Sequence, residues 1–205
     1  MRKEYVQGWI ALIVIAAGAT YFFVSTSKIP ERIDPQAEKA MTVLAETYVG
    51  NKSFTIMRPA TAMVLNGGFD QFVPVTKTSS VGIALLPELF KGTNLADAVV
   101  YVGATSTPSA LIACTLESQT TQETRTGTTT ISGADFASFH TKGVAKDDTY
   151  DVTTYRVIRE DKCYEIAKVL HSKDVTKLPH NTVEFDQPKY SGYLENIAQS
   201  FAFLP

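Results

Sequence analysis

The segment Val6–Val24 constrains the fold more than any other feature of the chain, because it contains no charged residue. Its 19 residues, VQGWIALIVIAAGATYFFV, would extend about 28 Å as an α-helix, close to the ~30 Å hydrocarbon core of a bilayer. Trp9 and Tyr21 lie near its two ends, where amphipathic aromatic rings favour the membrane interfaces. The segment therefore predicts a transmembrane helix that anchors the chain in the lipid bilayer.

Basic residues on either side of this segment predict its orientation. Arg2 and Lys3 precede it, and the positive-inside rule leaves them in the cytoplasm, although Lys28 and Arg32 beyond it weaken the bias. We expect a single-pass protein of the cell membrane with a cytoplasmic N-terminus. The predicted organisation is a cytoplasmic tip and transmembrane anchor (1–27), a stalk (28–34) and an extracytoplasmic α+β domain (35–205).

Two other interpretations of the apolar segment remain open. Ala17-Gly18-Ala19 has the small-x-small form that signal peptidase accepts, but cleavage after Ala19 would leave the apolar residues 21–24 at the start of the mature chain. A pilin-like subunit would carry glutamate five residues after Gly8, where this chain has Ile13. The anchor is therefore the favoured interpretation, and whether it is ever cleaved stays open.

Helical periodicity is found at both ends of the outer part. The spacing predicts a helix that begins at Pro35 and ends at Gly50, and a second helix that Pro188 opens, followed by Phe201–Phe203 tucked into the core. The apolar stripe of the first comprises Ala37, Ala40, Met41, Leu44, Ala45 and Tyr48. The stripe of the second comprises Tyr190, Tyr193, Leu194, Ile197, Ala198 and Phe201.

Short β-type runs fill the region between these helices. A hairpin is predicted from Thr149–Arg159 and Lys162–Leu170 across Glu160-Asp161, and such short links require antiparallel pairing. The sequence thus predicts an α+β fold with a mainly antiparallel sheet flanked by helices. The other expected strands are Ser53–Arg58, Ala62–Leu65, Phe69–Thr76, Ser80–Leu86, Ala98–Ala104 and Phe136–Thr141.

Four segments are less regular. Leu89–Asp97 and Lys142–Asp148 are expected to be loops, and Gln119–Thr130 an exposed edge strand or a flexible loop. Pro108–Glu117 is expected to be a short helix, with an apolar strand as the alternative.

Several local motifs resemble those of uncharacterised bacterial proteins that carry a single membrane anchor. The motifs are residues 92–98 (GTNLADA), Tyr155-Arg156, 163–166 (CYEI) and 197–203 (IAQSFAF), and the resemblance covers more than half of the chain. More distantly, the layout is similar to the PsbP-like fold, in which an antiparallel sheet carries helices on both sides and the last helix ends in a short Phe-x-Phe strand. Members of that fold bind partners or support complex assembly, and no shared catalytic set carries over to this chain.

Cys114 and Cys163 are the only two cysteines. The predicted topology places both outside the cytoplasm, where disulfides persist, so we expect a Cys114–Cys163 bridge. Two buried free thiols are the alternative, because free cysteine is often fully buried. A catalytic thiol is disfavoured, since the cysteines form no Cys-x-x-Cys pair and have no histidine nearby in the sequence.

No motif for catalysis, metal binding or cofactor binding stands out. His140, His171 and His180 are not spaced as metal ligands, although His171 with Asp174 comes closest to a pair. Ser132, Asp135 and His140 do not form a hydrolase signature, and glycine-rich phosphate loops are missing. We therefore predict no catalytic residue, no metal and no cofactor.

The charge balance bears on the class of partner. The 19 basic and 21 acidic residues give a net charge of -2 without any basic run, so nucleic acid is excluded as a partner. The resulting hypothesis is a membrane-tethered, non-catalytic domain that binds a protein partner or scaffolds an envelope complex. The rival is an envelope hydrolase whose site is assembled only by the fold.

Overall fold

The computed structural model describes residues 35–50, 52–66, 72–76, 80–118 and 122–205. The chain separates into two units, Met1–Arg32 and Ile33–Pro205, and every described residue belongs to the second. The predicted transmembrane helix and stalk, with the signal-peptide and pilin-like alternatives, lie outside the described residues. Within the described ranges, no helix has the length and apolar character needed to cross a bilayer.

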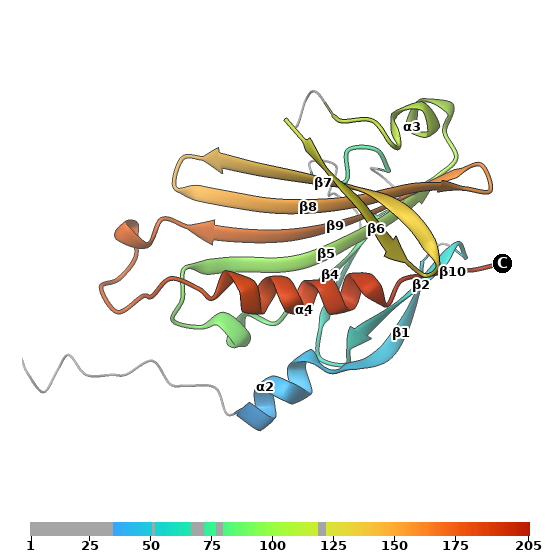
Figure 1. Ribbon diagram of the computed structural model, residues 1–205. Helices are drawn as coiled ribbons and strands as arrows, with labels where there is room; N and C mark the ends of the chain where they lie inside the picture. The colour runs from blue at the N-terminus through green and yellow to red at the C-terminus, as the bar shows by residue number, and fades with distance from the viewer. Residues whose placement is uncertain (1–34, 51, 67–71, 77–79, 119–121) are drawn as a thin grey trace, which may run out of the picture. The chain divides into compact units, whose positions relative to one another are not determined.

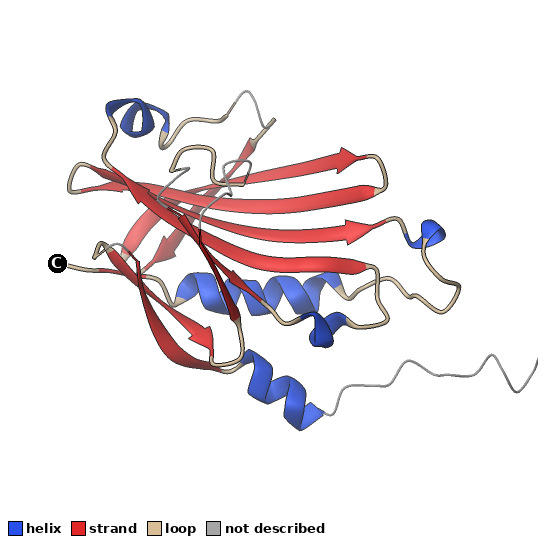
Figure 2. Ribbon diagram, turned by 180° about the vertical axis from the view of Figure 1, so that it is seen from behind, coloured by secondary structure: helices blue, strands red, loops and turns tan. Residues whose placement is uncertain are grey.

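A seven-stranded antiparallel sheet forms the body of the domain (Figure 1). Its strands follow the order β3-β4-β5-β9-β8-β7-β6, and every neighbouring pair is antiparallel. Few helices accompany the strands (Figure 2), which confirms the α+β class. The strands are β3 (Met63–Asn66), β4 (Ser80–Ala84), β5 (Leu95–Thr105), β6 (Thr124–Ile131), β7 (Ala134–Ala145), β8 (Asp148–Arg159) and β9 (Lys162–Lys173).

Two-residue turns join the last four strands of this sheet in chain order. Glu160 and Asp161 both have positive φ angles, as do Ser132 and Gly133 at the β6–β7 link. Such turns match the right-handed twist of the strands they connect. The predicted hairpin across Glu160-Asp161 is confirmed. For Gln119–Thr130 the sequence left an exposed edge strand or a flexible loop open, and β6 is an exposed edge strand.

A smaller sheet corrects the first predicted helix. Helix α2 (Pro35–Thr42) ends early, and residues 44–50 form strand β1 (Leu44–Gly50), which pairs with β2 (Phe54–Pro59). Strand β10 (Ala202–Phe203) pairs with the other side of β2. Leu44 and Tyr48 are four residues apart, a spacing that suits one face of a strand as well as of a helix. Gly50 is the last residue of β1, and a side chain there would clash with the Phe54 ring.

Three further expectations need correction. Residues 72–76 form turns, whereas the sequence predicts a strand over Phe69–Thr76, of which 69–71 lie outside the described residues. The predicted loop Lys142–Asp148 is mostly strand, because β7 and β8 continue to a tight turn at Lys146-Asp147. The predicted loop Leu89–Asp97 contains the end of the 3-10 helix η2 (Pro87–Phe90) and the start of β5.

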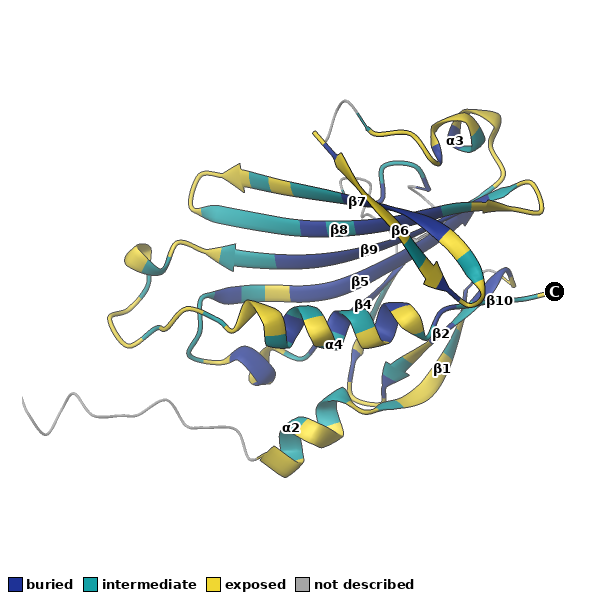
Figure 3. Ribbon diagram, viewed as in Figure 1, coloured by how far each residue is buried: buried dark blue, intermediate teal, exposed yellow. Residues whose placement is uncertain are grey.

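One face of the large sheet, which we call the helix face, is covered by α4 (Gln187–Gln199). Asp186 caps this helix by accepting a hydrogen bond from the Lys189 backbone N–H at 3.1 Å. The predicted C-terminal stripe is largely confirmed, since Tyr190, Leu194, Ile197, Ala198 and Phe201 are buried in the main core and Tyr193 is partly buried. Buried residues fill the central strands β5 and β9 beneath it (Figure 3).

A polar contact joins α4 to strands β8 and β9 of the sheet. Glu195 Oε2 accepts hydrogen bonds from Lys168 Nζ at 2.5 Å and from Tyr155 Oη at 2.8 Å. Burial acts to raise the pKa of Glu195, but the hydrogen bonds from Lys168 and Gln199 outweigh it and lower the pKa below its ordinary value. The helix is therefore held by apolar packing and by two ionic contacts, this one with the sheet and that of Lys189 with Glu38 of α2.

Candidate functional site

The opposite side of the large sheet, which we call the clamped face, carries two irregular segments. The first comprises residues 72–76, and the second comprises residues 107–118 with helix α3 (Pro108–Ala113). We refer to these two segments together as the clamped cover. Val73 is fully buried and packs with residues of β5 and β9, so the first segment lies directly on the sheet.

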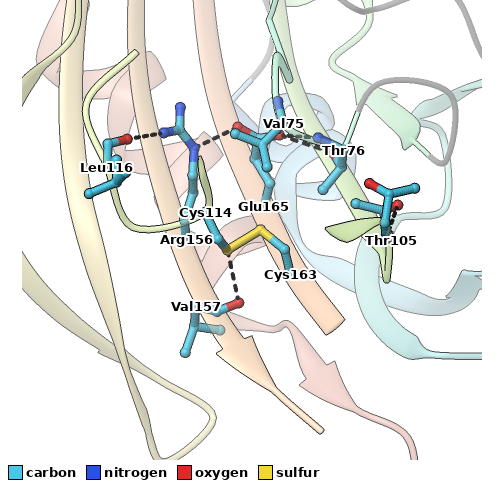
Figure 4. The surroundings of a disulfide bond; sticks show 10 residues. Val75, Thr76, Thr105, Cys114, Leu116, Arg156, Val157, Cys163 and Glu165 are labelled. Carbon is cyan, nitrogen blue, oxygen red and sulfur yellow. Dashed lines mark hydrogen bonds and ion pairs between the residues drawn. A yellow bond between two sulfur atoms is a disulfide. The ribbon is translucent and has the colours of Figure 1, made fainter. Parts of the chain in front are cut away.

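A disulfide joins the second segment to the sheet. Cys114, at the C-terminal end of α3, is bonded to Cys163 near the start of β9, and both residues are fully buried (Figure 4). The disulfide predicted from the cysteine count is thus present. It fixes the end of α3 at one point on the sheet.

Arg156 provides a second attachment for the same segment. Strand β8 places its side chain on the clamped face, where it is fully buried. Its Nη1 donates a hydrogen bond to the Leu116 carbonyl at 3.2 Å, and its Nη2 forms an ion pair with Glu123. The guanidinium carbon lies 4.7 Å from the centre of the Phe139 ring. The main chain beyond the disulfide is therefore held at a second point, the Leu116 carbonyl.

Glu165 attaches the first segment. It lies opposite Arg156 in the β8–β9 register, and its Oε1 accepts a hydrogen bond from Arg156 Nε at 2.7 Å. Its Oε2 accepts hydrogen bonds from the backbone N–H groups of Val75 and Thr76, at 3.2 and 2.9 Å, and from Thr76 Oγ1 at 3.0 Å (Figure 4). Burial raises the pKa of Glu165, and the neighbouring guanidinium and the Thr76 hydrogen bonds oppose that rise. One carboxylate thus connects residues 75–76 to Arg156.

These buried charges position the cover more than they stabilise the fold. Removing an ion from water costs several kcal/mol, and apolar side chains of similar volume often serve stability as well or better. Arg156 and Glu165 instead place their hydrogen bonds on the backbones of two segments that have little regular structure. The network therefore sets one position for each segment.

A pocket of about 350 Å³ lies between the two clamped segments and the end of β5. Its lining residues carry either hydroxyl groups or apolar side chains. Thr105 Oγ1 accepts a hydrogen bond from the Thr107 backbone N–H at 3.4 Å. Within the part of the chain that the structure describes, the hydroxyls of Thr107 and Ser109 have no hydrogen-bond partner. The lining comprises Pro74, Val75, Thr76, Thr105, Thr107, Ser109, Ala110 and Ala113.

Large apolar side chains are exposed around the disulfide. Ile112 is 73% exposed and Leu116 is 58% exposed, although the Leu116 backbone is held by Arg156. Ile158, 45% exposed, lies opposite Cys163 in the β8–β9 register. We call Ile112, Leu116 and Ile158 the α3 patch.

The histidines do not assemble into a site. The suggested pair separates, because His171 contacts Asp97 and Asp148 at 2.8 and 3.0 Å, whereas Asp174 caps the 3-10 helix η3 (Val175–Lys177). Among the described residues, no group of three or more His, Cys, Asp or Glu side chains could hold a metal ion.

The grouping of Ser132, Asp135 and His140 separates in the same way. His140 lies 3.3 Å from Asp151, and Asp135 accepts a hydrogen bond from Thr130. Ser132 forms part of the β6–β7 turn.

Sequence reasoning missed the Arg156–Glu165–Glu123 network. A signal for two of its members was present, because Arg156 stands between Tyr155 and Val157, and Glu165 between Tyr164 and Ile166, each in the middle of an apolar strand. A charge in such a position is buried only when it is paired.

The chain matches no family model and none of the curated proteins with which it was compared. Solved structures with a similar arrangement include a protein of Bacteroides thetaiotaomicron, with a TM-score of 0.48 and 9% identity, over 78% of this chain and 49% of that one. They also include LpqN of Mycobacterium tuberculosis, described as involved in cell envelope biogenesis. Its TM-score is 0.42 at 8% identity, over 74% of this chain and 83% of that one. The chain thus spans about half the length of the Bacteroides protein.

Proposed function

We propose that this protein is a membrane-tethered, non-catalytic extracytoplasmic domain that binds a protein partner and thereby scaffolds a complex of the cell envelope. The observation that carries this proposal is the α3 patch. Ile112 and Leu116 are held in solvent on a segment whose backbone is fixed by a disulfide and by Arg156.

Exposed apolar side chains on a rigid support suit protein recognition. A flexible segment could turn Ile112 and Leu116 inward, but the clamps at Cys114 and at the Leu116 carbonyl prevent such a rearrangement. A partner that covers these side chains removes apolar surface from water and pays little ordering entropy. The neighbouring pocket is lined by hydroxyls and apolar groups throughout, a composition that suits binding better than acid–base chemistry.

The proposed location follows from two features of the chain. The uncharged segment Val6–Val24 has the length of a membrane span, and the Cys114–Cys163 disulfide suits an oxidising compartment. We expect protease added to spheroplasts to degrade the chain beyond Ser25. Complete protection of that part would contradict the orientation, and a soluble chain starting at Thr20 would contradict the anchor.

We also propose that the domain has a PsbP-like arrangement. Support comes from α4 and α3, which lie on opposite faces of the antiparallel sheet, and from β10, which places Phe203 directly after the last helix. This proposal concerns architecture, and the binding role is argued from the α3 patch alone.

The binding role can be tested with two matched substitutions. Ile112 and Val144 are equally exposed, at 73%, but Val144 lies near the far end of β7 from the α3 patch. The full-length chain is crosslinked in membranes and purified, as wild type, Ile112→Glu and Val144→Glu. We expect one discrete crosslinked protein to be lost with Ile112→Glu and kept with Val144→Glu, at unchanged thermal stability.

Two outcomes would contradict the proposal. Equal crosslinking of all three chains would remove the α3 patch from the interface. Turnover of an envelope ester or amide by the purified full-length chain would favour the hydrolase hypothesis instead.

A further inference from the structure

We propose that the pocket between Thr76 and Ser109 binds an uncharged saccharide. This site is distinct from the α3 patch, and the inference does not depend on a protein partner. The pocket lies between residues 74–76, the start of α3 and the end of β5, whereas Ile112 and Leu116 project into solvent. Both residues are absent from the pocket lining.

The surrounding charges favour a neutral ligand. Arg156 is fully buried and engages both Glu165 and Glu123, so its charge is already compensated and offers little attraction to an anion. The Glu165 carboxylate is occupied by Arg156 and by the N–H groups of Val75 and Thr76, so it is not available to a cation. Among the described residues, the pocket lining therefore offers an ionic ligand no counter-charge for the hydration it would lose.

The lining also matches the mixed surface of a sugar ring. Thr107 and Ser109 can each donate and accept a hydrogen bond, and Thr105 Oγ1 already accepts one and can still donate. A ligand that matches these three side chains must carry groups that both donate and accept hydrogen bonds, as hydroxyls do. Pro74 and Ala113 add apolar contacts, which suit the C–H faces of the same ring.

Size and rigidity limit the ligand to one or two sugar rings. A volume of about 350 Å³ is at the lower end of the range for small-molecule sites. One wall is fixed by Glu165 through residues 75–76, and the other by the Cys114 disulfide. Walls that are already ordered reduce the entropy lost on binding, which matters most for a small polar ligand that gains little from apolar burial.

The test uses the full-length chain in lipid nanodiscs, because sugar-headed detergents would compete for the pocket. Cellobiose and N,N′-diacetylchitobiose are the neutral probes, and glucosamine and glucuronate are the cationic and anionic ones. Binding is followed by saturation-transfer NMR and titration up to about 10 mM. We expect the neutral disaccharides to bind and the charged sugars to bind at least tenfold more weakly.

Substitutions assign the binding to the pocket. Thr107→Val keeps the shape of the side chain and removes the hydroxyl, and combined with Ser109→Ala it should weaken disaccharide binding about tenfold or more. Ala113→Trp should abolish binding by filling the pocket. Thr128→Val, which removes an exposed hydroxyl from the edge strand β6, is the matched control and should bind as the wild type does. Thermal unfolding of each chain verifies that it is folded.

Several results would overturn the inference. If neither neutral disaccharide bound the wild type, a saccharide site here would be excluded. Unchanged binding of both to Ala113→Trp would exclude it as well. Equal binding of glucuronate or glucosamine would refute the neutral ligand class. Saturation by an uncharged capped dipeptide with no response to either disaccharide would assign the pocket to a peptide. None of these results affects crosslinking at Ile112, so the two proposals fail separately.

Discussion

The two faces of the large sheet are covered in different ways by residues of the same strands. On the helix face, Tyr164 and Ile166 of β9 pack with Leu194 and Ile197 of α4 in one apolar core. On the clamped face, the alternate residues Cys163 and Glu165 hold their cover by a covalent bond and by buried hydrogen bonds. Apolar packing gives stability without specifying single contacts, whereas the clamped face specifies single contacts at a cost in desolvation.

The difference supports placing the proposed function on the clamped face. A helix with an apolar stripe is positioned by its whole surface, so its outer side needs no further support. Segments 72–76 and 107–118 bury much less apolar surface, yet they border the pocket and carry most of the α3 patch. Their clamps provide the rigidity that a binding surface requires. Four predictions test this comparison, in order of decreasing effect.

Removal of α4 should have the largest effect. A chain that ends at Pro188 loses the buried residues Leu194, Ile197 and Phe201, each worth roughly 1.5 to 3 kcal/mol when fully buried, and should not fold. The point substitution Ile197→Ala should destabilise the domain by about 2 to 5 kcal/mol. Thermal unfolding of the truncated chain and of Ile197→Ala, each compared with the full-length wild type, measures both. An unchanged melting temperature after truncation would refute core packing and make α4 a detachable docking element.

Arg156→Met should be the most damaging substitution on the clamped face. It leaves the buried Glu165 without its cation, at an expected cost of about 3 to 5 kcal/mol, and it frees the Leu116 carbonyl. Adding Glu165→Gln should restore part of the stability, because no uncompensated charge then remains at that position.

Hydrogen exchange distinguishes a local effect from a global one. In Arg156→Met, amides of residues 107–118 should exchange faster while those of α4 keep their protection, once the change in global stability is subtracted. Arg125→Met, at an exposed arginine of β6, should change neither. Uniform loss of protection in both regions would remove the distinction between the two faces.

The same contrast explains which parts of the structure could be predicted from the sequence. The stripe of α4 and the β8–β9 hairpin were predictable because periodicity and turn position are local signals. Residues 44–50 were mistaken for helix because Leu44 and Tyr48 suit both periods, and the choice depends on β2, which comes later in the chain.

The clamped face was less accessible to such reasoning. The cysteine count suggested the disulfide, but the Arg156–Glu165 contact arises only when β8 and β9 pair in register. The pocket joins residues 74–76 to residues 105–113, which no sequence pattern connects. Periodicity thus predicts the helix face, while the clamped face depends on contacts between distant segments.

Loss of the disulfide should have the third largest effect. Cys114 and Cys163 are 49 residues apart, and on the chain-entropy model a loop of this size contributes about 4 kcal/mol, with strain and residual structure reducing the measured value to about 2 to 4 kcal/mol. We expect Cys114→Ala/Cys163→Ala to lower the melting temperature and to weaken crosslinking at Ile112. Alkylation of unfolded, unreduced wild-type protein should detect no free thiol, and two labelled cysteines would contradict the bridge.

The smallest effect is expected at the ionic contact between Glu195 and Lys168 on the helix face. Because the folded-state pKa of Glu195 is lowered, its contribution to stability is fully present above the ordinary pKa of 4.5 and is lost as the pH falls through the folded-state pKa. Glu195 is only partly buried, so Glu195→Gln should cost at most about 1 kcal/mol at pH 7. The melting temperatures of wild type and variant should then converge once the pH falls below the folded-state pKa of Glu195, where the carboxyl is protonated in both states of the wild type. A difference that stayed constant from pH 7 to this limit would show that the negative charge of Glu195 adds nothing to its hydrogen bonds with Lys168 and Tyr155. In that case the helix face would depend, like the clamped face, on specific polar contacts.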